Sequence, residues 1–430
     1  MSSASPPSSR LSIGYSTSSL GPPPASATQP PPPLPTKLAA IASAGGFSSI
    51  ELAVSDLRAY ASLLEKREVG EEEWAALERA AGQTRALCEQ LGLRIVVLQP
   101  FPHFEGWPRG SEEHARAWER MRGWTRIALA AGTDMIQVGS TDMDIPLAPQ
   151  RLEPASAVAP SASASASASA LRESVVQDLR ELGQYCAKLS PSPLRIAYEP
   201  WCWSTHAPTW ADCHAIIRAV DMPGVIGLCL DTFQIAGGEL ADPTTASGFI
   251  ESGDEGQGQG QGQGGGDVHD RFRASLERLS KEVRPEDIFF LQISDAYKPL
   301  HPYCRAAPDG RKGDGPKTRA EWSDTHRPAP FTTSTAPGAS AGQAESSYLT
   351  KPITDVFRAV LRTGWRGDCT IEVFDDPPHH GYPSQHNDEE QGGKQGGKQD
   401  QPQRCTPGGL LDEARRALAG WERLCKEAAV

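Results

Sequence analysis

The sequence predicts an α/β protein in which eight strands alternate with helices and close into a (β/α)8 TIM barrel. Short apolar runs without polar alternation recur along the chain, as expected for parallel strands that are covered on both faces. Segments with an apolar helical face separate these runs. Several runs also end on a carboxylate, and the clearest is 194–203 (LRIAYEPWCW), which presents Glu199 just before a proline. A buried strand gains nothing from such a charge unless something at its tip pairs with it.

The elements follow one another along the whole chain. The expected strands cover residues 11–16, 48–52, 94–100, 134–140, 194–203, 225–231, 288–295 and 368–374. The expected helices cover residues 37–44, 71–91, 112–131, 171–189, 209–220, 268–283, 353–363 and 410–427. Glycines that follow a helical pattern, such as Gly45 and Gly132, are typical of helix C-caps. Eight repeated strand–helix units favour a closed barrel over an open sheet.

Low-complexity segments interrupt this pattern. An Ala/Ser repeat and a Gly/Gln repeat have no side chains that could build a core, and without such segments roughly 300 residues remain, which suits one barrel with long loops. We therefore expect a disordered N-terminus at residues 1–10 and a single TIM-barrel domain over 11–430. Disordered insertions are expected near residues 154–170, 251–267, 305–346 and 376–408.

Composition narrows the function classes. The 430 residues carry a net charge of -12 and contain no Lys/Arg-rich run, which argues against a nucleic-acid partner. Nine cysteines without a CxxC pair favour reduced thiols. No apolar run approaches the roughly 20 residues that cross a bilayer, and the N-terminus lacks the apolar core of a secretory signal. We expect a cytoplasmic protein that acts on a small molecule and has no membrane partner. The sequence does not predict the oligomeric state.

Four predicted strand ends carry oxygen ligands that would meet at one end of the barrel. These residues are Glu199, Asp231, Gln292 and Glu372. Three carboxylates and one amide form a hard, oxygen-rich site, which suits Mg²⁺ or Mn²⁺, and also Co²⁺, better than a structural zinc. Three anions together would repel one another strongly without a cation. The alternative for each carboxylate is a structural role, in which it caps a helix or pairs with an arginine.

Several segments resemble the fungal 3-dehydroshikimate dehydratases of quinate catabolism, which belong to the xylose-isomerase-like TIM-barrel superfamily. The resemblance is strongest in YEPWCWSTHAPTW, GLCLDTFQIAGGELADPTTASG and FFLQISDA. It extends to KLAAIASAGGFSSIELAVSDL, LQPFPHFEGW, DLRELGQ and EWSDTHRPAPF, and it covers most of the chain outside the low-complexity segments. The combination of CLDTF with an upstream YE and CWST is the specific part of this signal.

The resemblance implies roles for particular residues. The four oxygen ligands match the metal ligands of the family, and a glutamine at the third position is similar to the dehydratase branch. In catalysis, the resemblance implies His103 as the general base and Glu51 as an alternative base or as a partner beside the ligands. Substrate contacts are expected from Gln99, Glu105, Arg109, Trp201 and Arg327. The arginine in the long loop after the seventh strand would grip the carboxylate of the substrate with two hydrogen bonds.

The function that the resemblance implies is the metal-assisted dehydration of 3-dehydroshikimate to protocatechuate. With the C3 carbonyl and C4 hydroxyl oxygens held by the cation, a base removes the proton between them and water leaves from the neighbouring carbon. Two other functions stay open. A sugar or keto-acid isomerase or epimerase would use the same metal site, although it would prefer two flanking carboxylates as bases. A catalytically degenerate barrel that binds a metabolite is the other.

Overall fold

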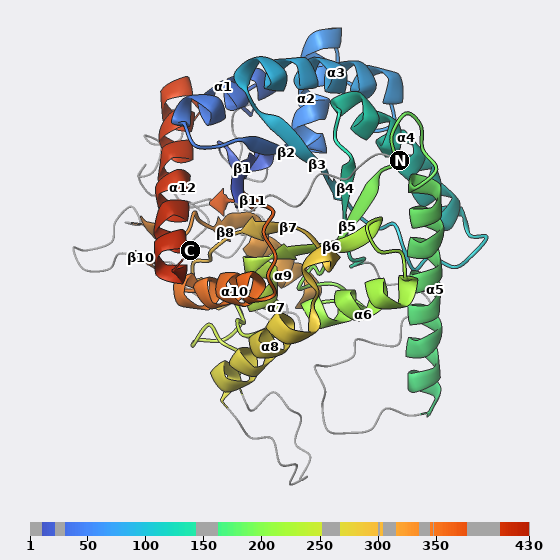
Figure 1. The fold of residues 1–430 in the computed structure, drawn as a ribbon, viewed down its shortest axis with the longest axis vertical. Coiled ribbons are helices and arrows are strands. Elements are labelled where there is room, and N and C mark those ends of the chain that lie inside the picture. The colour runs from blue at the N-terminus through green and yellow to red at the C-terminus, as the bar shows by residue number, and fades with distance from the viewer. Residues whose placement is uncertain are drawn as a thin grey trace, which may run out of the picture.

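A computed structural model shows a closed barrel of eight parallel strands, with the order β1-β11-β7-β6-β5-β4-β3-β2 around the ring (Figure 1). The structure describes residues 11–21, 31–142, 162–251, 267–299, 302–303, 315–334, 345–346, 348–375 and 405–429. The barrel strands are β1 (Ser12–Ser16), β2 (Ser49–Ala53), β3 (Arg94–Phe101), β4 (Met135–Gly139), β5 (Arg195–Glu199), β6 (Ile226–Asp231), β7 (Ile288–Ile293) and β11 (Asp368–Ile371). The predicted (β/α)8 fold is therefore confirmed.

Helices surround this barrel and bury its outer face (Figure 1). They are α1 (Leu34–Ala44), α2 (Val54–Glu65), α3 (Trp74–Leu91), α4 (Glu112–Ala131), α5 (Ala162–Cys186), α6 (Trp210–Val220), α8 (Val268–Glu282), α10 (Thr350–Arg362) and α12 (Pro407–Ala428). A further short helix, α7 (Thr232–Glu239), begins directly after β6. Within the described residues, no helix is both long and apolar enough to reach across a membrane.

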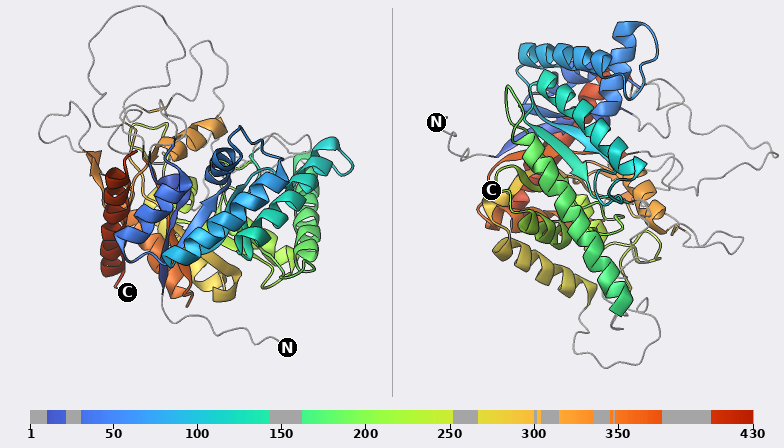
Figure 2. Two further views of the ribbon diagram at one scale, coloured as in Figure 1. Left: turned by 90° about the horizontal axis from the view of Figure 1, so that it is seen from above. Right: turned by 90° about the vertical axis from the view of Figure 1, so that its right-hand side faces the viewer.

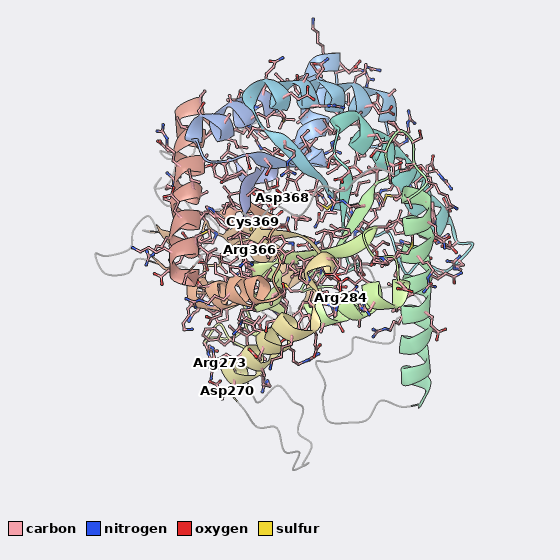
Figure 3. All side chains as sticks on the ribbon, viewed as in Figure 1. Asp270, Arg273, Arg284, Arg366, Asp368 and Cys369 are labelled. Atoms are coloured by element: carbon pink, nitrogen blue, oxygen red, sulfur yellow. The ribbon has the colours of Figure 1, made fainter. Side chains whose placement is uncertain are left out.

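The amino-terminal end of the barrel is held together by structural contacts. Asp368, at the start of β11 (Figure 3), forms an ion pair of 2.5 Å with Arg94 at the start of β3 and accepts a hydrogen bond from Ser12. Gly14 lies beside Ser49, and a Cβ at this glycine would come within 2.5 Å of the serine hydroxyl. A glycine is therefore needed where β1 and β2 close the ring.

The barrel interior changes from apolar to polar along its axis. A cluster of buried side chains inside the barrel includes Val97, Met135, Ala197, Cys229 and Phe290. Each of these residues is followed two positions later by a polar residue of the same strand. Because side chains in a strand alternate with a period of two, both sets point into the barrel. The polar set therefore lies above the apolar set, at the carboxyl end of the strands.

The Ala/Ser repeat differs from the expected insertion. Helix α5 begins at Ala162, so the second half of the segment 154–170 continues a helix rather than leaving the fold. Alanine has the highest helix propensity of all residues, and the helix can therefore extend backwards from its buried part. Helix α2, which follows β2 without a linker, was not predicted at all.

The segment 305–346 also contains ordered elements, although an insertion was expected there. Helix α9 (Gly315–Thr325) leads into β8 (His326–Arg327), which pairs antiparallel with β12 (Phe374–Asp375). Two further views place α9 over one end of the barrel (Figure 2). Trp322 of α9 is completely buried, and its indole nitrogen donates to the carbonyl of Tyr297. The remaining predicted segments lie largely outside the described residues. They are the N-terminal residues 1–10 and the expected insertions 251–267 and 376–408.

Glu239, at the end of α7, supports a prediction about the pH dependence of stability. Burial raises the pKa of Glu239 to about 7, while Ser275 donates a hydrogen bond of 2.8 Å to its carboxylate. The folded protein therefore keeps this proton at a pH where the unfolded chain has lost it, and stability falls as the pH rises from about 4.5 to about 7. Glu239→Gln is expected to remove this loss, which is on the order of 1–2 kcal/mol after allowance for partial exposure.

Denaturant unfolding of the two proteins at pH 5 and pH 8 measures this effect. The unfolding free energy of Glu239→Gln minus that of the wild type should be larger at pH 8 than at pH 5. An equal difference in unfolding free energy at both pH values would contradict the prediction.

Candidate active site

Each of the eight barrel strands contributes one polar side chain, within its last three residues or directly after it, to a ring at the carboxyl end of the barrel. No member of this polar ring is more than 6% exposed. Its members are Ser16, Glu51, Gln99, Gln137, Glu199, Asp231, Gln292 and Glu372. The structure thus brings together all four residues that were predicted as metal ligands. In barrels of this class, the carboxyl ends of the strands carry the catalytic residues.

Hydrogen bonds across the barrel link members of the ring. Gln292 Nε2 donates to Glu51 Oε2 over 2.8 Å, although β7 and β2 are not neighbouring strands. Gln99 Nε2 donates to Ser16 Oγ over 3.0 Å and lies 3.4 Å from Glu372 Oε1. Glu51 and Gln99, predicted as base and substrate contact, therefore both lie within the ring. They contact its members from strands that are not adjacent in the barrel.

The negative charges of the carboxyl groups in the ring are not balanced by nearby positive charge. Burial, together with the charges of Asp231 and Glu372, raises the pKa of Glu199 well above its ordinary value. Burial also raises the pKa of Asp231, that of Glu372 to about 7 and that of Glu51 to about 8. Desolvation thus penalises every one of these negative charges, and repulsion adds to the penalty on Glu51, Glu199 and Glu372. An additional cation would relieve this penalty.

Arg327 brings a positive charge into direct contact with the ring. Its Nη2 atom lies 2.5 Å from Asp231 Oδ2 and 2.7 Å from Glu372 Oε2. The same nitrogen donates to Ser294 Oγ, and Nη1 donates to Ser323 Oγ over 3.1 Å. The predicted substrate-binding arginine is therefore placed among the predicted metal ligands and is only 2% exposed.

The donor set fits a divalent cation in chemistry and in charge. The three carboxylates among the predicted ligands carry three negative charges when ionised, and Arg327 plus one divalent cation would neutralise them. Carboxylate and amide oxygens are the ligands that hard cations prefer. Among the described residues, no three His, Cys, Asp or Glu side chains lie close enough together to hold a metal ion in their present positions. The Nη2 atom of Arg327 lies against both Asp231 and Glu372.

Glu199 is held by two donors. The indole Nε1 of Trp201 donates to Glu199 Oε2 over 2.7 Å, and Gln137 Nε2 donates to the same oxygen. The indole stacks on Trp203, with ring centres 5.3 Å apart. A Cβ at Gly139 would overlap the ring of Trp201, so this glycine lets the indole reach Glu199. Trp201 was predicted as a substrate contact, and in this structure it also orients a predicted ligand.

Gly139→Ala is therefore expected to displace Trp201 while the strand stays folded. Loss of one hydrogen bond to a charged group should lower kcat/KM about tenfold or more. Steady-state kinetics measure this loss, and near-UV circular dichroism reports the stacked indole pair. Gly82→Ala in α3, where a Cβ meets nothing within 4 Å, serves as the control. Unchanged kinetics together with a changed tryptophan signal would contradict the role of Trp201.

His103 lies at the same end of the barrel, in the loop after β3. Its Nδ1 atom is 3.0 Å from Asp142 Oδ1, in the loop after β4. The two side chains are 30% and 26% exposed, so both are accessible from solution. His103 has φ +56°, a left-handed conformation that is uncommon for residues other than glycine. Such strain often occurs at functional sites. The acidic neighbour orients the imidazole, as expected for a general base.

Glu105 does not reach the ring. Its Oε1 atom accepts hydrogen bonds of 2.9 Å from the backbone of Thr141 and from the hydroxyl of Tyr198, and it lies 3.3 Å from His206. Tyr198 immediately precedes Glu199 in β5, so its side chain points to the outer face of the barrel. The carboxylate therefore joins loops behind β5, which differs from the substrate contact expected of it.

Arg109 is also placed away from the ring. Its guanidinium lies 3.1 Å from both Asp178 and Glu181, which belong to α5. Asp178 also accepts a hydrogen bond from the backbone of Gly106. Arg109 therefore ties the loop after β3 to α5, away from the ring where the substrate contact was expected. A motif places such a residue in a loop, but the direction of its side chain depends on tertiary packing.

Three site residues, Ser16, Gln137 and Asp142, were missed by the sequence analysis. Gln137 is the one polar side chain within the apolar strand β4, and it lies two residues after the interior residue Met135. This alternation is a usable signal. Asp142 follows the end of β4 and pairs with His103. Its position just beyond a strand end gave a weaker signal, because its partner comes from a different loop.

The chain belongs to the xylose isomerase-like TIM barrel family, whose model matches residues 38–393. Among its relatives in this family is the 3-dehydroshikimate dehydratase of Neurospora crassa. The two sequences are 30% identical over 302 residues, which cover 69% of this chain and 68% of the relative. The resemblance to fungal dehydratases is therefore confirmed.

Two bacterial proteins of the same name are also related to the chain. The 3-dehydroshikimate dehydratases of Pseudomonas putida and Pseudomonas aeruginosa are 29% and 30% identical to it over 201 residues. These matches cover 47% of this chain but only 24% of either bacterial protein. The shared part thus spans about a quarter of those proteins.

Solved structures show the same fold. A fusion of a xylose isomerase-like TIM barrel with a 4-hydroxyphenylpyruvate dioxygenase matches with a TM-score of 0.54 and 20% identity, over 98% of this chain and 43% of the fusion. The IolI protein, whose structure holds a zinc atom, matches with a TM-score of 0.51 and 13% identity, over 96% of this chain and 98% of IolI. At these identities the likeness shows the fold alone.

Proposed function

We propose that this protein is a divalent-metal-dependent hydro-lyase that converts 3-dehydroshikimate to protocatechuate. The main observation in support of this function is that four predicted ligands from four strands lie in one buried ring at the carboxyl end of the barrel. Relatives named as 3-dehydroshikimate dehydratases support the substrate. The residues that would hold the metal are Glu199, Asp231, Gln292 and Glu372. Mg²⁺ or Mn²⁺ suits this all-oxygen set best.

The chemistry of the substrate fits this arrangement. The proton on C4 lies next to the C3 carbonyl, and the hydroxyl on C5 is the leaving group. When bound, a divalent cation supplies electrophilic stabilisation of the negative charge that develops on the carbonyl oxygen. The protein supplies the base, the orientation of the ligands and the exclusion of water from the ring. Each of these tasks has residues in the structure.

His103 is the proposed base. Its Nε2 atom takes the C4 proton, while Asp142, whose Oδ1 atom lies 3.0 Å from Nδ1, holds the imidazole in place. The C4–C5 double bond forms as the C5–O bond breaks, and the proton held by His103 leaves with the hydroxide as water. The resulting dienone becomes aromatic when a C6 proton is lost and the C3 oxygen gains one. Glu51, which accepts a hydrogen bond from Gln292, is the alternative base.

The decisive test is an assay of the purified full-length protein with 3-dehydroshikimate. Protocatechuate should appear in its ultraviolet absorbance in the presence of Mg²⁺ or Mn²⁺ and should disappear after treatment with a chelator. Re-addition of the metal should restore the activity. A protein that leaves 3-dehydroshikimate unchanged but interconverts ketoses would instead be an isomerase or epimerase. A protein that binds metal and turns over neither substrate class would be a degenerate, metabolite-binding barrel.

A further inference from the structure

Arg327 is a deeply buried cation beside the ring, and its surroundings hold it firmly. The guanidinium carbon lies 4.7 Å from the ring centre of Phe233 and 5.1 Å from that of Phe374. The two aromatic rings stabilise its positive charge through cation–π contacts where water is excluded. Phe374 is also the strand partner of Arg327 in the β8–β12 pair. Two elements from different parts of the chain thus fix one charge beside the ring.

The oxygens that Arg327 contacts are those that a metal between Asp231 and Glu372 would need. Its Nη2 atom lies 2.5 Å from Asp231 Oδ2 and 2.7 Å from Glu372 Oε2. A divalent cation held by the same two carboxylates would carry its charge close to that of the guanidinium, and like charges repel. The two cations would therefore compete for these carboxylates.

The remaining oxygens of these two carboxylates already have donors. Asp231 Oδ1 accepts a hydrogen bond of 2.8 Å from the backbone of Phe233, which caps α7. Glu372 Oε1 lies 3.4 Å from Gln99 Nε2. Rotation of either carboxylate toward a metal would therefore break an existing contact. Displacement of Nη2 is the simplest way for a cation to reach both residues.

Some contacts of Arg327 do not involve the two carboxylates. Ser323 accepts from Nη1, and the aromatic rings of Phe233 and Phe374 lie against the guanidinium. Its Nε atom is buried and has no hydrogen-bond acceptor among the described residues. The present pairing therefore leaves one buried donor of the guanidinium unsatisfied, which is costly.

We propose that Arg327 is a resident counter-charge that competes with the divalent cation for Asp231 and Glu372 and thereby sets the metal affinity of the site. The inference rests on the proposed function only for the existence of the metal site. In the metal-free protein, Arg327 holds the two carboxylates in the absence of another cation. When metal binds, the guanidinium moves away from these oxygens, and part of the binding energy is spent on this displacement. Arg327 thereby weakens metal binding while it stabilises the metal-free fold.

Calorimetric titration of metal-free protein with Mn²⁺, without substrate, tests this proposal. Arg327→Gln removes the charge but keeps a hydrogen-bonding side chain, and its dissociation constant for Mn²⁺ should be at least about tenfold lower than that of the wild type. The metal-free variant should also melt at a lower temperature, and saturating Mn²⁺ should raise its Tm by more than that of the wild type. Circular dichroism establishes that the variant is folded.

Two further variants complete the test. Phe374→Leu removes one of the two aromatic rings that hold the guanidinium, and it should lower the dissociation constant for Mn²⁺ about threefold. This variant tests the proposal if Arg327→Gln does not fold. Arg319→Gln is the matched control, because this arginine donates to the carbonyls of Gly237 and Ala241 and contacts no predicted ligand. Its Mn²⁺ affinity should equal that of the wild type.

The outcomes separate this proposal from the function. A folded Arg327→Gln protein with unchanged or weaker Mn²⁺ binding would overturn the counter-charge role, even if the wild type turns over 3-dehydroshikimate. Mn²⁺ binding that occurs only in Arg327→Gln would support the competition and count against a metal-dependent function of the wild type. No Mn²⁺ binding by any variant would overturn both.

Discussion

Asp231→Asn is expected to lower kcat/KM for 3-dehydroshikimate by about 1000-fold or more, while the barrel stays folded. Asparagine keeps the oxygen that accepts from the backbone of Phe233, so the start of α7 remains capped. It removes the negative charge that faces Arg327 and the proposed metal. Metal ligation in an active site contributes several kcal/mol to the transition state, which corresponds to about three orders of magnitude in rate.

The measurement pairs kinetics with metal binding. Asp231→Asn and Glu199→Gln should both lose Mn²⁺ affinity and turnover together. Asp242→Asn is a matched control, because this buried aspartate accepts from the backbone of Thr244 outside the ring, and asparagine preserves that contact. If Asp231→Asn kept full activity, the assignment of the metal site would be wrong. Loss of turnover with unchanged metal affinity would instead make Asp231 a partner of Arg327 rather than a ligand.

The barrel could be predicted because its elements are locally encoded. The expected helix 112–131 coincides with α4, where Ser111 caps the first turn and Gly132 adopts φ +74° after the last. Strand β5 was recognised by its apolar run and by Glu199 at its end. Helix α2 was missed because it begins directly after β2, with no capping side chain at its start. Its boundary is set by packing against the barrel rather than by a local signal.

The ligand positions could be predicted for a different reason. A polar residue that lies two positions after an interior apolar residue of the same strand must also face the interior of the barrel. This rule also finds Gln137, and it excludes Tyr198, whose side chain faces outward. It is silent about residues in loops. The directions of Glu105 and Arg109, and the pairing of Arg327 with Asp231, depend on contacts between segments that are far apart in the sequence.

His103→Asn is expected to lower kcat about 100- to 10,000-fold, because it removes the proposed base from the loop after β3. Asparagine is the matched replacement, since it tolerates the left-handed conformation that His103 adopts at φ +56°. Mn²⁺ affinity should be unchanged, because His103 is not among the ring residues. This combination distinguishes the variant from Asp231→Asn, which should lose both properties.

Asp142→Asn separates the orientation of the base from its presence. The amide can no longer hold the imidazole with a charge at 3.0 Å, so kcat should fall by a smaller factor, about 10- to 100-fold. A normal kcat for His103→Asn would contradict the assignment, and the base would then be sought in Glu51, beside Gln292 inside the ring. In that case Glu51→Gln should abolish turnover without a change in Mn²⁺ affinity.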